Sequence, residues 1–373
     1  MLSSTSALHR TADLSLPNET LAAIFDGLPP PALADITRVS RRFNAVAERI
    51  LYSFISITDL LSASAPIPTK TLRCCQSILR RPHLVEAIKR LQIRWQGDFR
   101  ALSPQKLAAA CTEAGAAIQS LLFLEGLDIF LGPANLAIVP SPPIHAIERM
   151  VQGCQFPSLR YCSFSAEWTK GVQRYTTILP EFLTLVPSLR QLKISDHHAA
   201  LILAPHALPA LSYFRGSPDA AASLLPGRPV EHLALIGQDS DVNRENLPKM
   251  ALTSVALRSL DLSAMQVRPI LLRNISSYLS GIENLKVRLA LRHTLHYALS
   301  GITLLAGLSS VLSEFPHLVC FDLSPTEILG GEATFTEEAA LCTAWGQVCP
   351  LNRIVFPSGT NWQLTAEGTW TRD

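Results

Sequence analysis

The hydrophobic pattern is most regular near the start of the chain, where apolar residues follow a helical spacing. Four of them lie at i, i+3, i+4 and i+7 and so share one face of a helix: Leu21, Ile24, Phe25 and Leu28. We expect Asn18 to cap the start of this helix through its side-chain oxygen. The helix is expected to end at Gly27 and the prolines at 29–31, because proline lacks the backbone donor that a helix needs.

Two further helices are expected directly afterwards. A short one carries Leu33 and Ile36 and extends toward Val39. Ser40 is suited to capping the third, which keeps helical spacing over about three turns at Phe43, Val46, Ala47, Ile50, Leu51 and Phe54. Three helices in about forty residues bury little surface, so this unit is expected to need a partner or the following domain for stability.

The order of these residues resembles the F-box, a three-helix protein-binding module. The family pattern appears over roughly the first 57 residues as Leu16-Pro17, Glu19, Leu21, Ile24-Phe25, Leu28-Pro29, Leu33, Val39-Ser40-Arg41 and Phe43. The family often has Trp at the last position, where this chain has Phe43.

The resemblance implies docking onto the Skp-type adaptor of a cullin-RING ubiquitin ligase. The residues it assigns to adaptor contact are Leu16, Pro17, Leu21, Ile24, Phe25, Leu28, Leu33, Val39 and Phe43. The alternative is that some apolar residues of the module form only its internal core. That alternative is strongest for Val46, Ile50 and Leu51, and weakest for the Leu16-Pro17 edge, which lies outside the expected helices.

A short phrase, apolar-x-x-apolar-x-apolar, recurs along the rest of the chain. Its copies begin at Ile88, Ile118, Leu159, Leu189, Leu211, Val230, Leu257, Ile282, Leu318 and Leu351. These starting points lie 19 to 41 residues apart, about 29 on average, which is the upper end of the leucine-rich-repeat period. The spacing is irregular and the asparagine of the consensus repeat is missing, but the phrase resembles that family.

Each phrase is expected to form a short strand whose apolar residues point into a stack. One unit has too little core alone, and stacking of neighbours supplies it. Helices are expected between the phrases at 106–117, 179–185, 267–281 and 337–348. The fold class expected is therefore α/β: an N-terminal three-helix F-box followed by a curved leucine-rich-repeat-like solenoid with a parallel sheet on one face.

Proline-rich and small-residue segments at 132–144 and 217–229 are expected to be loops or inserts. Near the end of the chain, Trp362 and Trp370 flank a turn at Glu367-Gly368, which predicts a last strand with a hairpin-like cap. The layout as a whole resembles the large fungal family of F-box proteins. The domains are interpreted as a disordered tail at 1–13, the F-box at 14–57, a linker and first helix at 58–84, and the solenoid with its cap at 85–373.

Composition narrows the class of protein. With 48% hydrophobic and 17% charged residues, the chain can bury a large core, and a net charge of +2 gives no argument for a nucleic-acid partner. Eight cysteines show no metal-ligand spacing, so reduced thiols in the cytoplasm or nucleus are expected. The most apolar window, 289–312, has an uncharged part of 16 residues. A membrane span needs about 20, so a buried helix and no membrane partner are expected.

A search for chemistry finds no glycine-rich phosphate loop, GxSxG elbow or HExxH helix. His197-His198, beside Asp196, is interpreted as part of a loop rather than as a metal site. Cys74-Cys75 is interpreted as buried packing rather than as a nucleophile. We therefore expect no catalytic, cofactor-binding or metal-binding residues.

The outward-facing strand positions are expected to line the concave side of the solenoid, where such folds bind partners. Arginine and tyrosine side chains there would suit an acidic or phosphorylated target. The residues assigned to target binding are Arg90, Arg94, Tyr161, Lys193, Tyr213, Arg215, Lys286, Arg288 and Arg353. The alternative is that they are ordinary solvated residues.

The sequence thus predicts a non-enzymatic substrate-recognition subunit of a cullin-RING ubiquitin ligase of the SCF type. The F-box would bind the Skp-type adaptor, and through it a cullin, while the repeats hold a target protein. One alternative is a binding scaffold derived from an F-box protein and not coupled to ubiquitination. Another is a hydrolase, which a Ser or Cys, His and Asp cluster in the folded chain would indicate.

Overall fold

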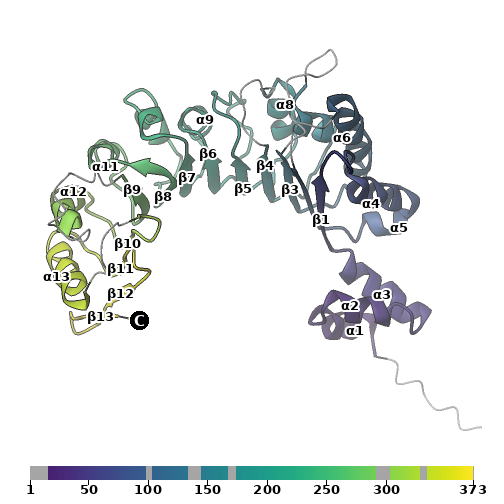
Figure 1. Ribbon diagram of the computed structural model, residues 1–373, viewed down its shortest axis with the longest axis horizontal. Coiled ribbons are helices and arrows are strands. Elements are labelled where there is room, and N and C mark those ends of the chain that lie inside the picture. The colour runs from purple at the N-terminus through teal and green to yellow at the C-terminus, as the bar shows by residue number, and fades with distance from the viewer. Residues whose placement is uncertain are drawn as a thin grey trace, which may run out of the picture.

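The computed structural model describes residues 16–97, 103–132, 144–166, 174–290, 303–327 and 334–372. Two parts are visible in Figure 1: a small helical module at the amino-terminal end, and a long arch whose strands line the inner side and whose helices lie outside. The arch is open on the side where the module and the carboxyl-terminal strands lie. The expected tail at 1–13 falls outside the described residues.

The small module consists of three helices, α1 (Asn18–Asp26), α2 (Pro30–Ile36) and α3 (Arg41–Leu51). Ser40 caps α3 as expected, because its hydroxyl accepts a hydrogen bond from the Phe43 backbone N–H. The capping role expected of Asn18 is wrong: Asn18 is the first residue of α1, with Pro17 at the cap position. Its side-chain oxygen instead accepts a hydrogen bond from Arg42, 2.8 Å away.

The arch contains one sheet, in which each strand pairs with the next along the chain. Strands β1 to β11 pair in parallel, and β12 and β13 are added antiparallel. The strands are β1 (Phe54–Leu61), β2 (Arg90–Gly97), β3 (Gly126–Leu131), β4 (Tyr161–Ser165), β5 (Gln191–Ile194), β6 (Tyr213–Gly216), β7 (His232–Ile236), β8 (Ser259–Val267), β9 (Asn284–Leu289), β10 (Cys320–Asp322), β11 (Arg353–Val355), β12 (Asn361–Leu364) and β13 (Trp370–Arg372).

The connection from β5 to β6, all of it within the described residues, contains no helix, whereas helices join the other successive strands up to β11 and cover the outer side of the arch (Figure 1). They are α4 (Thr69–Arg80), α5 (Pro82–Val85), α6 (Pro104–Gln119), α7 (Ala146–Val151), α8 (Ile178–Thr184), α9 (Pro218–Leu224), α10 (Leu247–Met250), α11 (Pro269–Ser276), α12 (Ser309–Leu312) and α13 (Phe335–Gly346), with short 3-10 turns η3 (Asp239–Asp241) and η4 (Thr303–Leu308). Strand, helix and parallel strand in repeated order form a solenoid of the leucine-rich-repeat type, as the sequence predicts.

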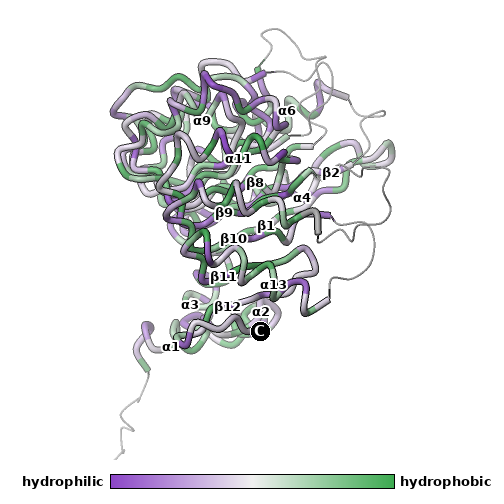
Figure 2. The backbone as a smooth tube through the Cα atoms, turned by 90° about the vertical axis from the view of Figure 1, so that its left-hand side faces the viewer, coloured by the Kyte–Doolittle hydropathy of each residue, from purple (hydrophilic) through white to green (hydrophobic). Residues whose placement is uncertain are grey.

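Side chains alternate between the two faces of the sheet. In β1, for example, every second residue from Ile55 to Leu61 is buried and the residues between are exposed. The buried rows join the helices in one continuous hydrophobic core from Ile55 to Trp362. The stack of strands from β8 to β12 is seen edge-on in Figure 2, where apolar and polar stretches follow one another along the tube.

The small module has a separate hydrophobic core. Its buried residues are Leu21, Phe25, Leu33, Val46 and Ala47, and none of them belongs to the core of the arch. Two residues, Tyr52 and Ser53, connect α3 to β1. The module is thus a distinct packing unit held close to the first strand of the solenoid.

The strand register shows that one of the expected copies of the phrase is misplaced. The copy expected at Ile118 is wrong, because Ile118 lies buried in the last turn of α6 and the strand begins eight residues later at Gly126. The first strands pair Phe54 with Arg90, Arg90 with Gly126 and Gly126 with Tyr161, so their repeats are 36, 36 and 35 residues long. The amino-terminal repeats are therefore more regular than the sequence suggested.

Two segments expected to be irregular contain regular structure. Residues 58–61, assigned to a linker, complete β1, and Asp59 there is buried because its carboxylate accepts hydrogen bonds from the Thr71 backbone and hydroxyl. The segment 217–229 contains α9, since Ser217 caps it and Pro218 occupies the first turn, where proline fits a helix. Residues 133–143 of the expected insert and residues 291–302, half of the apolar window at 289–312, lie outside the described residues.

The carboxyl-terminal hairpin is confirmed. Strands β12 and β13 pair antiparallel, and Gly368 adopts a positive φ of 79° in the turn between them. Buried Glu338 of α13 fixes this cap by accepting hydrogen bonds from the Ser358 and Thr360 hydroxyls, 2.7 Å each, and from the Trp362 indole at 2.8 Å. The cap closes the end of the hydrophobic core.

None of the helices within the described residues combines the length and the apolar character that crossing a bilayer requires.

Candidate interaction surfaces

The surface of the helical module includes only part of the residues assigned to adaptor contact. Leu21, Phe25 and Leu33 are buried in its core, and Leu28 and Phe43 pack against that core. These five therefore set the shape of the module rather than its outer face. The assigned residues that remain exposed are Leu16 (49%), Pro17, Ile24 (51%) and Val39 (66%). Contact with an adaptor stays a prediction for these four.

Arg42 holds the Leu16-Pro17 edge in place. Its guanidinium donates to the Leu16 carbonyl and to the Asn18 side chain, so it ties the start of α1 to α3. In the sequence, Arg42 looks like a solvated residue on the polar side of a helix. Its partners lie 24 and 26 residues away, so no local pattern points to this role.

A second candidate surface is the concave face of the sheet, which carries the residues assigned to target binding. The structure places them on this face at strand positions that alternate with the buried rows. Parallel pairing brings some of them together: Lys193 lies beside Arg215, and its ammonium group lies 5.3 Å from the Tyr161 ring and 5.6 Å from the Tyr213 ring. Strand β11, which carries Arg353, lies far along the arch from β4 to β6 (Figure 1).

Several of these cations form ion pairs or hydrogen bonds with acidic or polar neighbours. Arg94 pairs with Asp128 at 3.2 Å and Lys286 pairs with Asp322 at 2.9 Å. Arg288 pairs with Glu327, and Arg353 donates to Asn361. Burial works against ionisation of Asp322, but hydrogen bonds from Ser324 and Lys286 lower its pKa overall. Carboxylates therefore neutralise Arg94, Lys286 and Arg288, and the basic ladder that the sequence suggested is not continuous.

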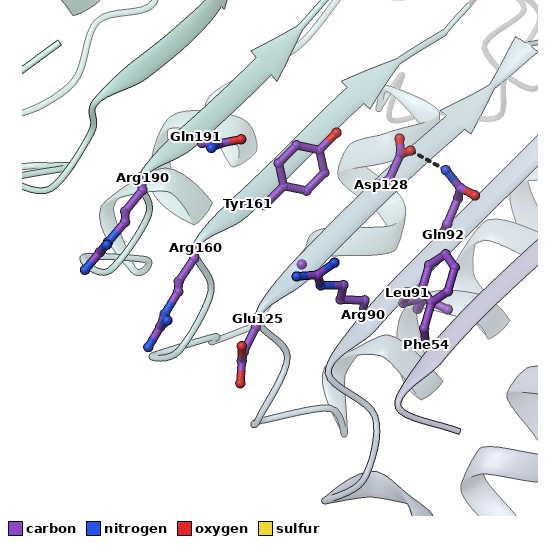
Figure 3. Close-up of a pocket in the computed structure, with 11 residues that line it drawn as sticks. Phe54, Arg90, Leu91, Gln92, Glu125, Asp128, Arg160, Tyr161, Arg190 and Gln191 are labelled. Atoms are coloured by element: carbon purple, nitrogen blue, oxygen red, sulfur yellow. Dashed lines mark hydrogen bonds between the residues drawn. The ribbon is translucent and has the colours of Figure 1, made fainter. Parts of the chain in front are cut away.

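A pocket of about 520 Å³ opens on the concave face across β1 to β5. Gly126 forms part of its lining because the absence of a side chain there leaves a gap between Arg90 and Tyr161, its partners in the strand register. Gln92 of β2 donates a hydrogen bond to Asp128 of the neighbouring strand β3, as Figure 3 shows. The remaining lining residues are Phe54, Leu91, Glu125, Arg160, Arg190 and Gln191.

Three side chains of this pocket were missed in the sequence. Arg160 and Arg190 stand one residue before their strands, and Figure 3 shows both projecting from the same edge of the sheet. Phe54 fits both the spacing of the third helix and a strand at 54–57. In the structure it begins β1 and is 55% exposed on the concave side. The available signal was the second position of the phrase, which is basic in the copies that begin at Ile88, Leu159, Leu189 and Leu257.

A buried polar cluster lies near the carboxyl ends of β4 and β5. The imidazole of His145 lies 3.2 Å from a carboxylate oxygen of Asp196, and both side chains are almost fully buried. His145 Nδ1 accepts a hydrogen bond from the Ile147 backbone N–H, so Nε2 carries the proton and donates to Asp196. Asp196 also accepts hydrogen bonds from Tyr175 and from the Ala166 backbone.

This cluster does not form a catalytic triad within the described residues. Both ring nitrogens of His145 are used in hydrogen bonds, so neither is available to activate a Ser or Cys nucleophile. Burial lowers the pKa of neighbouring His197 and raises that of the Cys162 thiol. Among the described residues, no group of three or more His, Cys, Asp or Glu side chains could hold a metal ion. The cluster is a packing feature of the repeats.

Comparison with known proteins adds one direct match. A protein-family model described as F-box-like matches residues 13–64, which contain α1 to α3 and β1. No curated protein matches the chain.

Two solved structures resemble the whole chain distantly. An internalin (inlF) from Listeria monocytogenes is 11% identical, with a TM-score of 0.32 over 83% of this chain and 82% of that one. A complex of Rad7 and Elc1 in yeast gives 12% identity and a TM-score of 0.37 over 90% of this chain and 87% of that one. Together with the three-helix core and the parallel sheet described above, the family match identifies this chain as one that carries an F-box-like domain followed by a leucine-rich-repeat solenoid.

Proposed function

We propose that this protein is a substrate-recognition subunit of an SCF-type cullin-RING ubiquitin ligase. Its F-box-like domain binds a Skp-type adaptor, and through it a cullin, while the concave face of the solenoid holds a target protein. The chain itself performs no covalent chemistry in this role. It raises the concentration of target lysines near the enzyme that carries ubiquitin. The eight free cysteines, all of which have raised pKa values through burial, fit a reducing compartment such as the cytoplasm or nucleus.

One observation carries the proposal. A helical module with its own core and with exposed apolar residues is joined by only two residues to a solenoid whose concave face is open. An exposed Leu16, Ile24 and Val39 on so small a unit favour burial against another protein. The short connection favours a defined position of the bound target relative to the adaptor.

The test is capture of the adaptor by the full chain. Purified Skp-type adaptor should co-precipitate with the wild-type protein, and the double substitution Leu16→Asp and Pro17→Ala should abolish capture. Ile202→Asp is the matched control, because Ile202 is an exposed apolar residue (79%) of the solenoid, outside the F-box-like domain. A well-folded wild-type chain that never captures adaptor would reject the proposal.

Target holding is tested separately in cells. Proteins that bind the solenoid should accumulate when the chain is deleted, and the Leu16→Asp and Pro17→Ala variant should fail to restore their turnover. Adaptor binding without any stabilised target would instead favour the scaffold that is not coupled to ubiquitination.

A further inference from the structure

The pocket around Gly126 differs from the rest of the concave face in its charge. Arg90, Arg160 and Arg190 line it, and within the described part of the chain none of their guanidinium groups makes an ion pair. Two carboxylates also line it. Asp128 is neutralised by Arg94, which leaves Glu125 against three arginines. An excess of positive charge therefore remains at this end of the sheet.

We propose that this pocket binds an oxyanion-bearing side chain of the target protein, either a phosphorylated residue or a carboxylate. The inference rests on the proposed function and names the chemical class of target that the concave face selects. Guanidinium groups bind phosphate and carboxylate oxygens through paired, charge-assisted hydrogen bonds. Arg90 at the start of β2, and Arg160 and Arg190 just before β4 and β5, provide such donors around one pocket.

The shape of the pocket supports a side chain as the occupant. Gly126 leaves the space open, since any side chain there would enter the gap beside Arg90, whose Cγ would lie 3.3 Å from the added Cβ. The exposed ring of Phe54 and the half-buried ring of Tyr161 lie on either side (Figure 3). Aromatic rings contribute rigid contact area at low entropic cost. An extended peptide can thus place its backbone along the rings and one anionic group among the arginines.

The charge pattern favours a protein segment over a nucleic acid. A polynucleotide carries a charge at every residue and is bound by basic rows that follow its backbone. Toward β9, Lys286 and Arg288 are paired with Asp322 and Glu327, and the chain as a whole has a net charge of only +2. One local cluster of unpaired arginines suits one or two anionic groups rather than a continuous phosphate backbone.

The experiment measures binding of defined probes to the full chain by fluorescence anisotropy. Three pools of short labelled peptides share random flanks and carry phosphoserine, glutamate or serine at the centre, and a single-stranded RNA is the fourth probe. The phosphoserine pool, the glutamate pool or both should bind more tightly than the serine pool, and the order of the two identifies the source of the oxyanion.

Two variants test the pocket itself. Gly126→Leu fills it without changing its charge, and Arg190→Glu reverses one charge. Each should weaken binding of the anionic pool roughly tenfold or more, as expected for loss of a charge-assisted hydrogen bond. Arg258→Glu is the matched control, because Arg258 also stands one residue before its strand but lies outside the pocket. Circular dichroism confirms that each variant is folded.

The inference is overturned if no pool binds, if the serine pool binds as tightly as the anionic pools, if Gly126→Leu leaves anionic binding unchanged, or if RNA displaces the peptides. Adaptor capture is measured on the same preparations. A chain that captures adaptor but shows any of these outcomes loses only this inference, whereas a chain that captures no adaptor contradicts the proposed function.

Discussion

Shortening one buried side chain should unfold the F-box-like domain while the solenoid stays intact. Leu33 is 3% exposed in the small core formed by α1 to α3. A Leu→Ala change in a core costs about 2–5 kcal/mol. Folded proteins gain about 0.05–0.15 kcal/mol per residue, which gives a module of about forty residues roughly 2–6 kcal/mol in total. Leu33→Ala therefore removes an amount comparable with the whole stability of the module.

Hydrogen exchange followed by mass spectrometry separates the two cores. In the variant, backbone amides of α1 to α3 should exchange rapidly, while those of β2 to β4 keep wild-type protection because their core shares no buried residue with the module. Adaptor capture should fall in parallel. Val39→Ala is the control for hydrogen exchange alone: Val39 is exposed, and surface changes usually alter the free energy of unfolding by no more than about 0.5 kcal/mol. Unchanged protection of α1 to α3, or loss of protection in both parts together, would refute the separation of the cores.

Two further predictions concern stability. Glu338→Ala removes the acceptor for Ser358, Thr360 and Trp362 in the carboxyl-terminal cap, so the free energy of unfolding in urea should fall by about 3 kcal/mol; a loss within measurement error would contradict the role of this carboxylate. Burial raises the pKa of the Cys111 thiol from 9.0 to about 12. The neutral thiol therefore contributes fully to the free energy of unfolding below pH 9.0, and this contribution is lost as the pH rises toward 12. Wild-type stability should fall over this range, and Cys111→Ala should reduce the slope of free energy of unfolding against pH; an unchanged slope would count against this linkage.

The sequence could predict the architecture because two local patterns repeat. A cap at Ser40 followed by apolar residues at helical spacing defines α3. The alternating phrase defines the parallel strands from Leu159 onward. Both patterns depend on neighbours a few residues apart, so they are visible without knowledge of the fold. The parallel order of the sheet follows because each strand is separated from the next by a helix or loop long enough for a crossover.

The sequence could not separate surface from core within the small module. Leu21 and Ile24 both fit one helical face, yet Leu21 is buried and Ile24 is half exposed. Three residues along a helix turn the side chain by about 60° from full alignment, and which edge of the apolar stripe is covered depends on where α3 crosses α1. That crossing is a tertiary property. The same limit hid Arg42, whose partners Leu16 and Asn18 lie more than twenty residues away.

The error at β3 had a different cause and hid the pocket. Ile118, Leu121 and Phe123 have the spacing of the phrase, but the same spacing occurs where a helix ends and the chain turns into a strand. The true copy begins at Leu124 and contains Gly126, a residue type that is unfavourable within strands. Placing the strand wrongly moved Gly126 out of register with Arg90 and Tyr161, so the gap between them could not be seen.

The two ends of the concave face differ in whether their cations are paired with carboxylates. Toward β9 and β10, Lys286 and Arg288 meet carboxylates of the neighbouring repeat. Partly exposed pairs of this kind contribute little stability, but they cancel the local field. Arg90, Arg160 and Arg190 have no such partner among the described residues, so the repeats nearest to the F-box-like domain keep a local excess of positive charge. Because only Tyr52 and Ser53 join that domain to β1, a target held at these arginines would lie close to a bound adaptor, whereas a target held near β10 would lie at the far end of the arch.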